Sequence, residues 1–101
     1  MTQLQEKAIN RIRNLVESDM YSDDQEIKIW EVTEHDYFVS LVVEYGLKGD
    51  EGTLACLIAR TRAHLFIGKR GGITYPVWSR GRQVCRQFKG YSILQAALDQ
   101  K

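Results

Sequence analysis

The sequence predicts an α+β domain in which an N-terminal helix, a four-stranded antiparallel meander and one or two short C-terminal helices share one core. Three observations predict it: apolar residues recur at helical spacing near the N-terminus, apolar and polar residues alternate over most of residues 26–78, and glycines separate the alternating runs. Placing the helices on one face of the sheet satisfies this order with short connections. The length of 101 residues fits a single domain, residues 1–101, with a modest core.

The first helix is predicted from its capping residues and its apolar stripe. Thr2 is placed to act as the N-cap with Gln5 three residues later, which is a capping-box pattern. The stripe is wide enough to cover one face of a sheet, and the helix is expected to end near residues 18–20. The stripe consists of Leu4, Ala8, Ile12 and Leu15, widened by Ile9 and Val16.

Residues 26–33 and 37–45 are predicted to form an antiparallel hairpin, because both are rich in β-branched and aromatic residues and a short turn at residues 34–36 joins them. The second strand has the clearer alternation, which divides its side chains between two faces. One face carries Tyr37, Val39, Leu41, Val43 and Tyr45, and the other carries Phe38, Ser40, Val42 and Glu44.

Residues 53–68 are predicted to form one long strand, because a period of two persists there without Gly, Pro, Asn or Asp until the final glycine. Its length exceeds that of ordinary strands, so a bend or bulge is expected in its middle. The glycine-rich turn at residues 68–72 leads to a fourth strand at residues 73–78. Pro76 has no N–H group to donate to a neighbouring strand, so this strand is expected at an edge of the sheet.

Residues 79–89 fit either a helix or a strand, and the spacing favours a helix. The adjacent apolar residues Val84 and Cys85 interrupt alternation, whereas helical spacing places three basic residues on one side. These basic residues are Arg82, Arg86 and Lys89. A last helix is expected from Ile93 to about Asp99, with Ser92 as its N-cap.

Charge is distributed unevenly along the chain, although the formal net charge is only +1. Residues 1–50 contain five Lys/Arg and eleven Asp/Glu, for a net charge of −6, and residues 51–101 contain nine and two, for +7. Such asymmetry predicts either a surface that binds a polyanion or a pairing of the two halves, within one molecule or across an oligomer.

Basic residues of the second half are the candidate anion-binding side chains, because each phosphate that they neutralise releases bound counterions. The partner expected on this basis is nucleic acid or a phosphorylated ligand. The candidates are Arg60, Arg62, His64, Lys69, Arg70, Arg80, Arg82, Arg86 and Lys89. Aromatic residues interleaved with them are candidates for stacking on bases, namely Tyr75, Trp78 and Tyr91.

Two local features bear on this hypothesis. The glycine-flanked turn around Lys69 and Arg70 allows backbone N–H groups to converge on an anion, but it serves equally well as a plain hairpin turn. Arginines on a strand face can also pair with acidic residues of the neighbouring strands, which would leave them less free for a ligand. The acidic residues in question are Glu31, Glu34 and Glu44.

No motif in the sequence indicates catalysis, a cofactor or a metal. The two histidines, His35 and His64, lie in no nucleophile context, and no Cys or His pair has the spacing of zinc ligands. Cys56 and Cys85 are expected to be buried thiols. We therefore expect a protein that is not an enzyme and that has no cofactor and no metal.

Three functions remain as hypotheses for a chain that is expected to be cytoplasmic and not associated with a membrane, since it shows no signal peptide and no long apolar run. The first is a non-catalytic module that binds nucleic acid or a phosphate ligand. The second is a homo-oligomer formed between acidic and basic regions, with residues 73–78 as the contact edge. The third is a small-ligand pocket between helix and sheet, lined by Tyr37, Tyr45 or Trp30.

Overall fold

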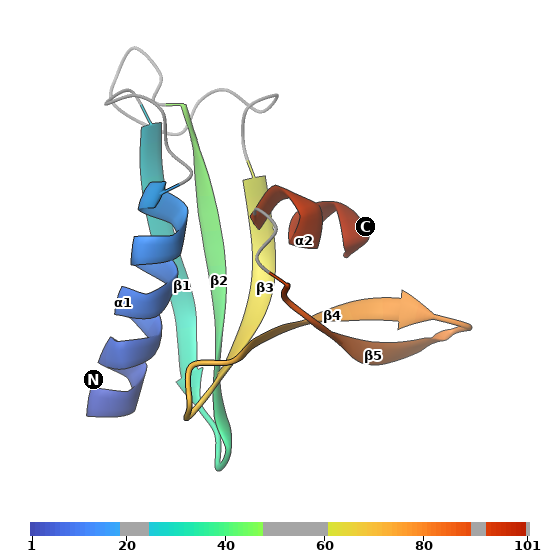
Figure 1. The fold of residues 1–101 in the computed structure, drawn as a ribbon, viewed down its shortest axis with the longest axis horizontal. Coiled ribbons are helices and arrows are strands. Elements are labelled where there is room, and N and C mark those ends of the chain that lie inside the picture. Colours follow the sequence, from blue (N-terminus) through green and yellow to red (C-terminus); the bar gives the residue numbers. More distant parts are fainter. Residues whose placement is uncertain (19–24, 48–60, 90–92, 101) are drawn as a thin grey trace.

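A computed structural model describes residues 1–18, 25–47, 61–89 and 93–100 and has the predicted α+β class (Figure 1). The described strands form one antiparallel sheet in the order β1-β2-β3-β4-β5, one strand more than expected. The elements are α1 (Gln3–Ser18), β1 (Gln25–Glu34), β2 (Phe38–Leu47), β3 (Thr61–Gly68), β4 (Ile73–Ser79), β5 (Arg82–Gln87) and α2 (Ile93–Asp99).

Helix α1 begins with the predicted capping box. The Gln5 amide donates to Thr2 Oγ1 at 3.1 Å, and the Thr2 amide donates to Gln5 Oε1 at 2.8 Å. Two N–H groups that the helix leaves unpaired are satisfied in this way. The buried residues of the helix are Ala8, Ile12 and Val16, which belong to the predicted stripe.

The core lies between the two helices and one face of the sheet, which we call the inner face. Alternate residues of the strands point to it, and both helices contribute to the same apolar cluster, so the helices lie on one face as predicted. Tyr37 was expected on this face but is 82% exposed, because it belongs to the turn before β2. The buried inner-face residues of β2, β3 and β4 are Val39, Leu41, Val43, Tyr45, Thr61, Ala63, Leu65, Ile67, Ile73, Tyr75 and Val77.

Strand β1 pairs with β2 as predicted, and it contains a bulge. The register shifts between Trp30 and Thr33, where Glu31 has a positive φ of 52°. The extra residue keeps Val32 in contact with the core while Trp30 stays on the opposite, outer face of the sheet. A bulge on a strand at the edge of a sheet also makes pairing with another chain less favourable.

Within residues 79–89, Arg82–Gln87 form strand β5 and not the helix that the spacing of this segment favoured. Ser79 pairs with Arg82 across a two-residue turn in which Arg80 and Gly81 have φ values of 53° and 79°. Positive φ at both positions is the signature of the type I′ hairpin turn. All six residues of β5 are exposed, so neither of its faces needed an apolar pattern and the strand left no alternation in the sequence.

Strand β4 is not an edge strand, contrary to the prediction from Pro76. It lies between β3 and β5, but it pairs with β3 only through Phe66↔Thr74 and Ile67↔Ile73. Both pairs precede Pro76, so its missing N–H group interrupts no β3–β4 ladder. Beyond them the β4–β5 hairpin turns away from the other three strands, as Figure 1 shows.

Helix α2 contacts both β3 and this hairpin. The Gln100 side-chain amide, just after the helix, donates to the His64 carbonyl at 2.8 Å and accepts from the His64 amide at 2.9 Å. It therefore bonds the edge of β3 at the point that β4 has left. The Tyr75 hydroxyl of β4 donates to Asp99 Oδ2 of α2 at 2.8 Å.

The first half of the predicted long strand, residues 53–60, and the predicted cap Ser92 lie outside the described residues. Only Thr61–Gly68 of that strand is described. Among the described residues, no helix combines the length and the apolar character that crossing a membrane requires.

Replacing Gly81 by Ala is expected to destabilise the protein by roughly 1–2 kcal/mol, because a side chain at positive φ is strained even where space is free. Gly72→Ala is the matched control, since a Cβ there also meets nothing within 4 Å and the φ of Gly72 lies outside the positive range. The control is expected to be neutral or slightly stabilising. Urea unfolding of both variants measures the difference, and equal midpoints would contradict the assigned turn.

Candidate functional site

The basic residues predicted to bind an anion do not form a single patch in the described part of the chain. Strand β4, with seven residues, separates the β3–β4 turn from the hairpin tip by roughly 20 Å of extended backbone. Arg60 and Tyr91 lie outside the described residues. The others lie in four places: on the outer face of β3 (Arg62, His64), in the β3–β4 turn (Lys69, Arg70), at the hairpin tip (Arg80, Arg82), and beside α2 (Arg86, Lys89).

Arg62 is engaged with the sheet itself. Its guanidinium carbon lies 4.7 Å from the centroid of the Trp30 ring, and Lys28 Nζ lies 4.8 Å from the same ring. Both distances suit cation–π attraction. Glu44, only 7% exposed, is the cross-strand neighbour of both cations. The contact with Trp30 was not predicted, and it makes Arg62 a poorer candidate for an external anion than its exposure suggests.

Arg86 and Tyr75 share one carboxylate, Asp99. Arg86 Nη1 donates to Asp99 Oδ2 at 3.1 Å, the Tyr75 hydroxyl donates to the same oxygen, and Gln95 Nε2 donates to Oδ1 at 3.0 Å. Tyr75 is only 4% exposed, so the prediction that it stacks on bases is wrong. The signal that could have shown this is its place in the apolar alternation of residues 73–77. Lys89 lines a hollow beside this cluster.

These contacts shift the ionisation of all three groups. The hydrogen bond from Tyr75, supported by Gln95 and Arg86, lowers the pKa of Asp99 below its ordinary value of 3.8. Burial, followed by the bond to Asp99, raises the pKa of Tyr75, and the bond to Asp99 raises the pKa of Arg86. The carboxylate therefore stabilises the fold above the ordinary Asp pKa, and this contribution is lost as the pH falls through the lowered value.

Asp99→Asn is expected to lower the unfolding temperature at neutral pH, because the charge-assisted bonds to Tyr75 and Arg86 weaken. The difference from the wild type should shrink as the pH falls below 3.8 and the native carboxyl becomes protonated. Thermal unfolding followed by circular dichroism at several pH values measures it. Leu98→Ala, at a half-exposed position of the same helix, is the control whose effect should not vary with pH. A pH-independent effect of Asp99→Asn would contradict the assigned role.

The hairpin tip presents charge and an aromatic ring to solvent. Trp78 is 70% exposed, Arg80 lies in the turn beyond it, and Arg82 follows that turn. Residues 73–89 contain four basic residues and no Asp or Glu. Trp78 also lines a hollow of about 230 Å3 on the outer face together with His64 of β3 and Gln83 of β5. The tip and the outer face of β3 are thus continuous at this hollow.

A second basic group lies between α1 and the β3–β4 turn, and only its turn residues, Lys69 and Arg70, were predicted to bind an anion. Lys69 and Arg70 of the turn line a hollow of about 270 Å3 together with Lys7 and Arg11 of α1. The two pairs are some sixty residues apart in the sequence. The only sequence signal for the helix pair was its i, i+4 spacing on one side of an amphipathic helix.

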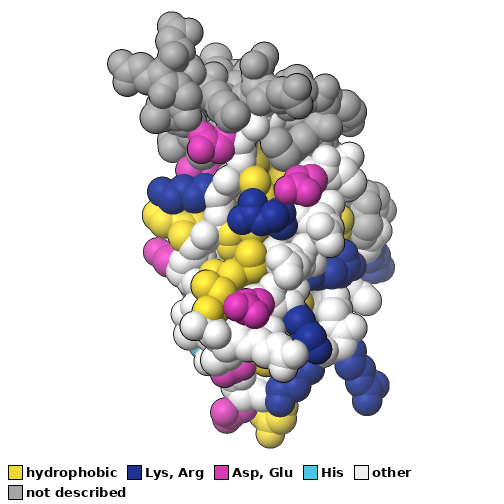
Figure 2. Space-filling model, turned by 90° about the vertical axis from the view of Figure 1, so that its left-hand side faces the viewer, with side chains coloured by type: hydrophobic (Ala, Val, Ile, Leu, Met, Phe, Trp, Pro, Cys, Tyr) yellow, Lys and Arg dark blue, Asp and Glu magenta, His cyan; other side chains and the backbone are white. Residues whose placement is uncertain are grey.

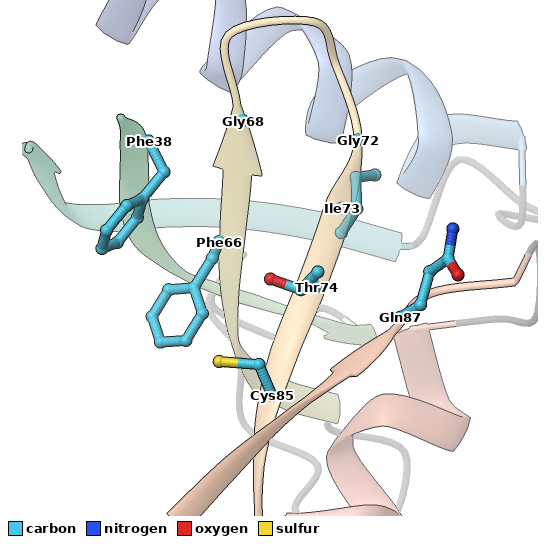
Figure 3. A pocket seen from close by; sticks show the side chains of 8 residues that line it. All are labelled: Phe38, Phe66, Gly68, Gly72, Ile73, Thr74, Cys85 and Gln87. Carbon is cyan, nitrogen blue, oxygen red and sulfur yellow. The ribbon is translucent and has the colours of Figure 1, made fainter. Parts of the chain in front are cut away.

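The largest of the hollows formed by described residues is apolar and lies on the outer face, where β3 and the β4–β5 hairpin diverge (Figure 3). Its volume is about 530 Å3, and Phe38, Phe66, Thr74, Cys85 and Gln87 line it with Gly68, Gly72 and Ile73. The hypothesis of a pocket between helix and sheet lined by Tyr37, Tyr45 or Trp30 does not describe this hollow, and none of these three residues lines a described pocket. Cys85 is the one titratable side chain that lines this hollow, so the lining offers no acid–base pair.

The remaining candidate side chains are the cysteines and His35, and their surroundings do not resemble a catalytic or metal-binding site among the described residues. Cys85 is exposed, contrary to the expectation of a buried thiol, because it lies on the fully exposed strand β5; Cys56 lies outside the described residues. His35 stacks on Phe38 with ring centroids 4.4 Å apart and bonds Ser40 Oγ at 2.9 Å. Among the described residues, no three His, Cys, Asp or Glu side chains gather as a metal site.

The described acidic residues of the N-terminal half are not segregated from basic residues on the face that Figure 2 shows. On the side of the molecule where α1 and β1 lie, acidic and basic side chains are interspersed, as Figure 2 shows. The asymmetry of the sequence therefore does not become two opposed charged faces on that side. What remains is the contrast with the β4–β5 hairpin, which has basic residues and no acidic ones.

Known proteins supply no further guide to these sites. Comparison of the chain with protein-family models, curated proteins and solved structures gave no significant match.

Proposed function

We propose that this protein is a non-catalytic binding module for nucleic acid, and that the β4–β5 hairpin is the element that contacts it. The observation that carries the proposal is a hairpin that leaves the sheet after two β3–β4 pairs and bears three basic residues with no acidic ones. All of β5 is exposed, and so is Trp78. A cytoplasmic location is the setting in which such a module would meet its ligand.

Duplex DNA is the form of nucleic acid that suits this shape best. The major groove of B-DNA is about 12 Å wide and admits a two-stranded β-ribbon, whereas the major groove of duplex RNA is too deep and narrow for side chains to read. Arg80 and Arg82 at the tip are placed to neutralise phosphates. Trp78 offers a flat apolar surface to a base step or to the groove wall.

The proposed contact is mainly with the sugar–phosphate backbone. Guanidinium groups form bidentate bonds to phosphate, and the described hairpin holds two of them at its tip in the solvent. Arg86 contributes less because Asp99 already binds it. Weak sequence preference and strong salt dependence are the expected properties of such an interface.

Fluorescence titration tests the proposal with duplex DNA, single-stranded DNA and duplex RNA of matched length and sequence, at low and at moderate salt. We expect duplex DNA to bind most tightly, with an affinity that falls steeply as salt rises. Tryptophan fluorescence should change on binding because Trp78 contacts the DNA. Trp78→Phe measures how much of the change comes from Trp78, since Trp30 is the other tryptophan of the chain. Absence of binding at low salt, or binding that ignores salt, would contradict the proposal.

Self-association is a second candidate, favoured by the opposite charge of the two edge strands. β1 carries Glu26, Glu31 and Glu34 against one lysine, and β5 carries Arg82 and Arg86 with no acid. Pairing β5 of one copy with β1 of another would have to accommodate the β1 bulge and would give an open-ended assembly, whereas two β5 strands would bring like charges together. This replaces the predicted contact at residues 73–78, which lie inside the sheet. Light scattering should then show growth with concentration that salt reverses, and a monomer throughout would exclude it.

A further inference from the structure

The hollow between α1 and the β3–β4 turn combines four basic side chains with an apolar floor. Lys7 and Arg11 come from one turn of α1 to the next, and Lys69 and Arg70 come from the turn between the strands. No Asp or Glu lines it, and none of the four makes an ion pair with another described residue. The floor is formed by Leu4, Ala8 and Ile67.

The local structure explains why these cations converge. Lys7 and Arg11, at i and i+4, lie beside the apolar stripe that fastens α1 to the sheet, so they point along the border of that contact. In the turn, the Gly71 amide donates to the Gly68 carbonyl at 3.0 Å, and Gly71 has a φ of 87°. The glycine closes the turn next to α1, with Lys69 and Arg70 at its tip.

This arrangement is unfavourable for the isolated protein. Like charges at i and i+4 of a helix destabilise it, and two further cations face the same space. All four side chains are exposed, so solvent screens part of this repulsion. A bound dianion would remove the repulsion and add charge-assisted hydrogen bonds, which Arg forms in bidentate geometry with phosphate oxygens.

The backbone of the turn that lines this hollow also has unused N–H donors among the described residues. The turn hydrogen bonds run from the Gly68 amide to Gly72 and from the Gly71 amide to Gly68. The amides of Lys69 and Arg70 are not used in them or in another hydrogen bond between described residues. Successive backbone N–H groups at a tight turn form a common anion-binding element.

We propose that this hollow is a site for a phosphoryl group, separate from the β4–β5 hairpin. Its volume of about 270 Å3 lies just under the roughly 300–1,000 Å3 typical of pockets for drug-sized ligands, so a phosphate or diphosphate group suits it. Lys7 and Arg11 bind one side of the group, and Lys69 and Arg70 bind the other. The group belongs either to a free phosphorylated small molecule or to the 5′ end of a nucleic acid.

Pyrophosphate is the probe for the free ligand, with amide chemical shifts in the wild-type protein as the readout. We expect saturable shifts at residues 68–71 and in α1 around Lys7 and Arg11. Lys69→Ala/Arg70→Ala should weaken binding roughly tenfold or more, since each change removes a hydrogen bond to a charged group. Arg13→Ala, an exposed basic residue of α1 outside the hollow, should change the affinity less than about twofold.

A second variant distinguishes loss of the binding site from loss of the folded structure. Lys7→Ala/Arg11→Ala places good helix formers on α1, so it should fold at least as stably as the wild type and still lose pyrophosphate binding. Loss of binding in a variant that is more stable is the signature of a site whose charges repel one another without ligand. Equal binding by the wild type and this variant would overturn the proposal. So would shifts that do not saturate, or chloride and sulfate acting as well as pyrophosphate.

Oligonucleotides with and without a 5′-phosphate identify the source of the group. Tighter binding of the phosphorylated strand, lost in Lys69→Ala/Arg70→Ala, would assign the hollow to a nucleic-acid end, whereas pyrophosphate binding without that preference would assign it to a free small ligand. The hairpin variant Arg80→Asn/Arg82→Ala removes the same charge and should keep pyrophosphate binding. If it loses duplex DNA but keeps pyrophosphate, the two sites are separate, and failure of one proposal leaves the other standing. If it loses pyrophosphate as well, the separate site is refuted.

Discussion

The double variant Arg80→Asn/Arg82→Ala is expected to bind duplex DNA on the order of 50-fold more weakly than the wild type at about 0.1 M salt, under the proposed hairpin contact. Each phosphate contact contributes about 0.9 to the slope of log affinity against log salt, so losing two contacts should reduce the slope by about 2. At about 0.1 M salt this amounts to somewhat under two decades in affinity. Fluorescence anisotropy over a salt series measures both quantities.

The substitutions in this variant are chosen to preserve the hairpin. Arg80 has a φ of 53°, and Asn is favoured at such a position in a type I′ turn, so Arg80→Asn should not weaken the turn. Ala at Arg82 removes only an exposed side chain. Arg13→Ala lowers the net charge from α1 and should leave the slope nearly unchanged. A slope that falls equally in all variants would mean that DNA responds to overall charge, and the hairpin would not be its contact.

Leu65→Ala is expected to destabilise the protein by about 2–5 kcal/mol, which is a large part of the stability of a small domain. Leu65 is fully buried on the inner face of β3, where its neighbour across the β2–β3 ladder is the equally buried Leu41. Truncation there loses burial and leaves a cavity that the surrounding packed core cannot readily close. For a chain of this size, each kcal/mol lowers the unfolding temperature by about 4–8 °C.

Two further substitutions serve as reference variants for this prediction. Leu98→Ala removes a leucine that is half exposed and should change stability by less than about 0.5 kcal/mol. Leu65→Met keeps the volume and should cost under about 1.5 kcal/mol. Urea unfolding followed by circular dichroism separates the three. If Leu65→Ala were as mild as Leu98→Ala, the inner face of β3 would not be the centre of the core.

The sequence by itself determined the elements that bury one face. The stripe of α1, the capping box at Thr2 and the alternation in β2 all follow from local chemistry, because burial against a single partner surface imposes a period on the residues. Tyr75 shows how neglecting this periodic pattern led to a wrong prediction. It was predicted to stack on a ligand for its aromatic ring, but its alternation with Ile73 and Val77 is the pattern of a buried position.

The tertiary structure decided two kinds of feature. One is a segment without a periodic apolar pattern, and the other is a site formed by residues that are far apart in the sequence. Strand β5 is exposed on both faces, so only its ladder with β4 distinguishes it from a helix, although the Arg80–Gly81 turn was a signal in the sequence. The basic hollow depends on α1 lying against the β3–β4 turn, which places Lys7 and Lys69 around one space. A charge count can reveal that basic residues are plentiful, but only packing decides which of them meet, because the Coulomb energy depends on distance in space and not along the chain.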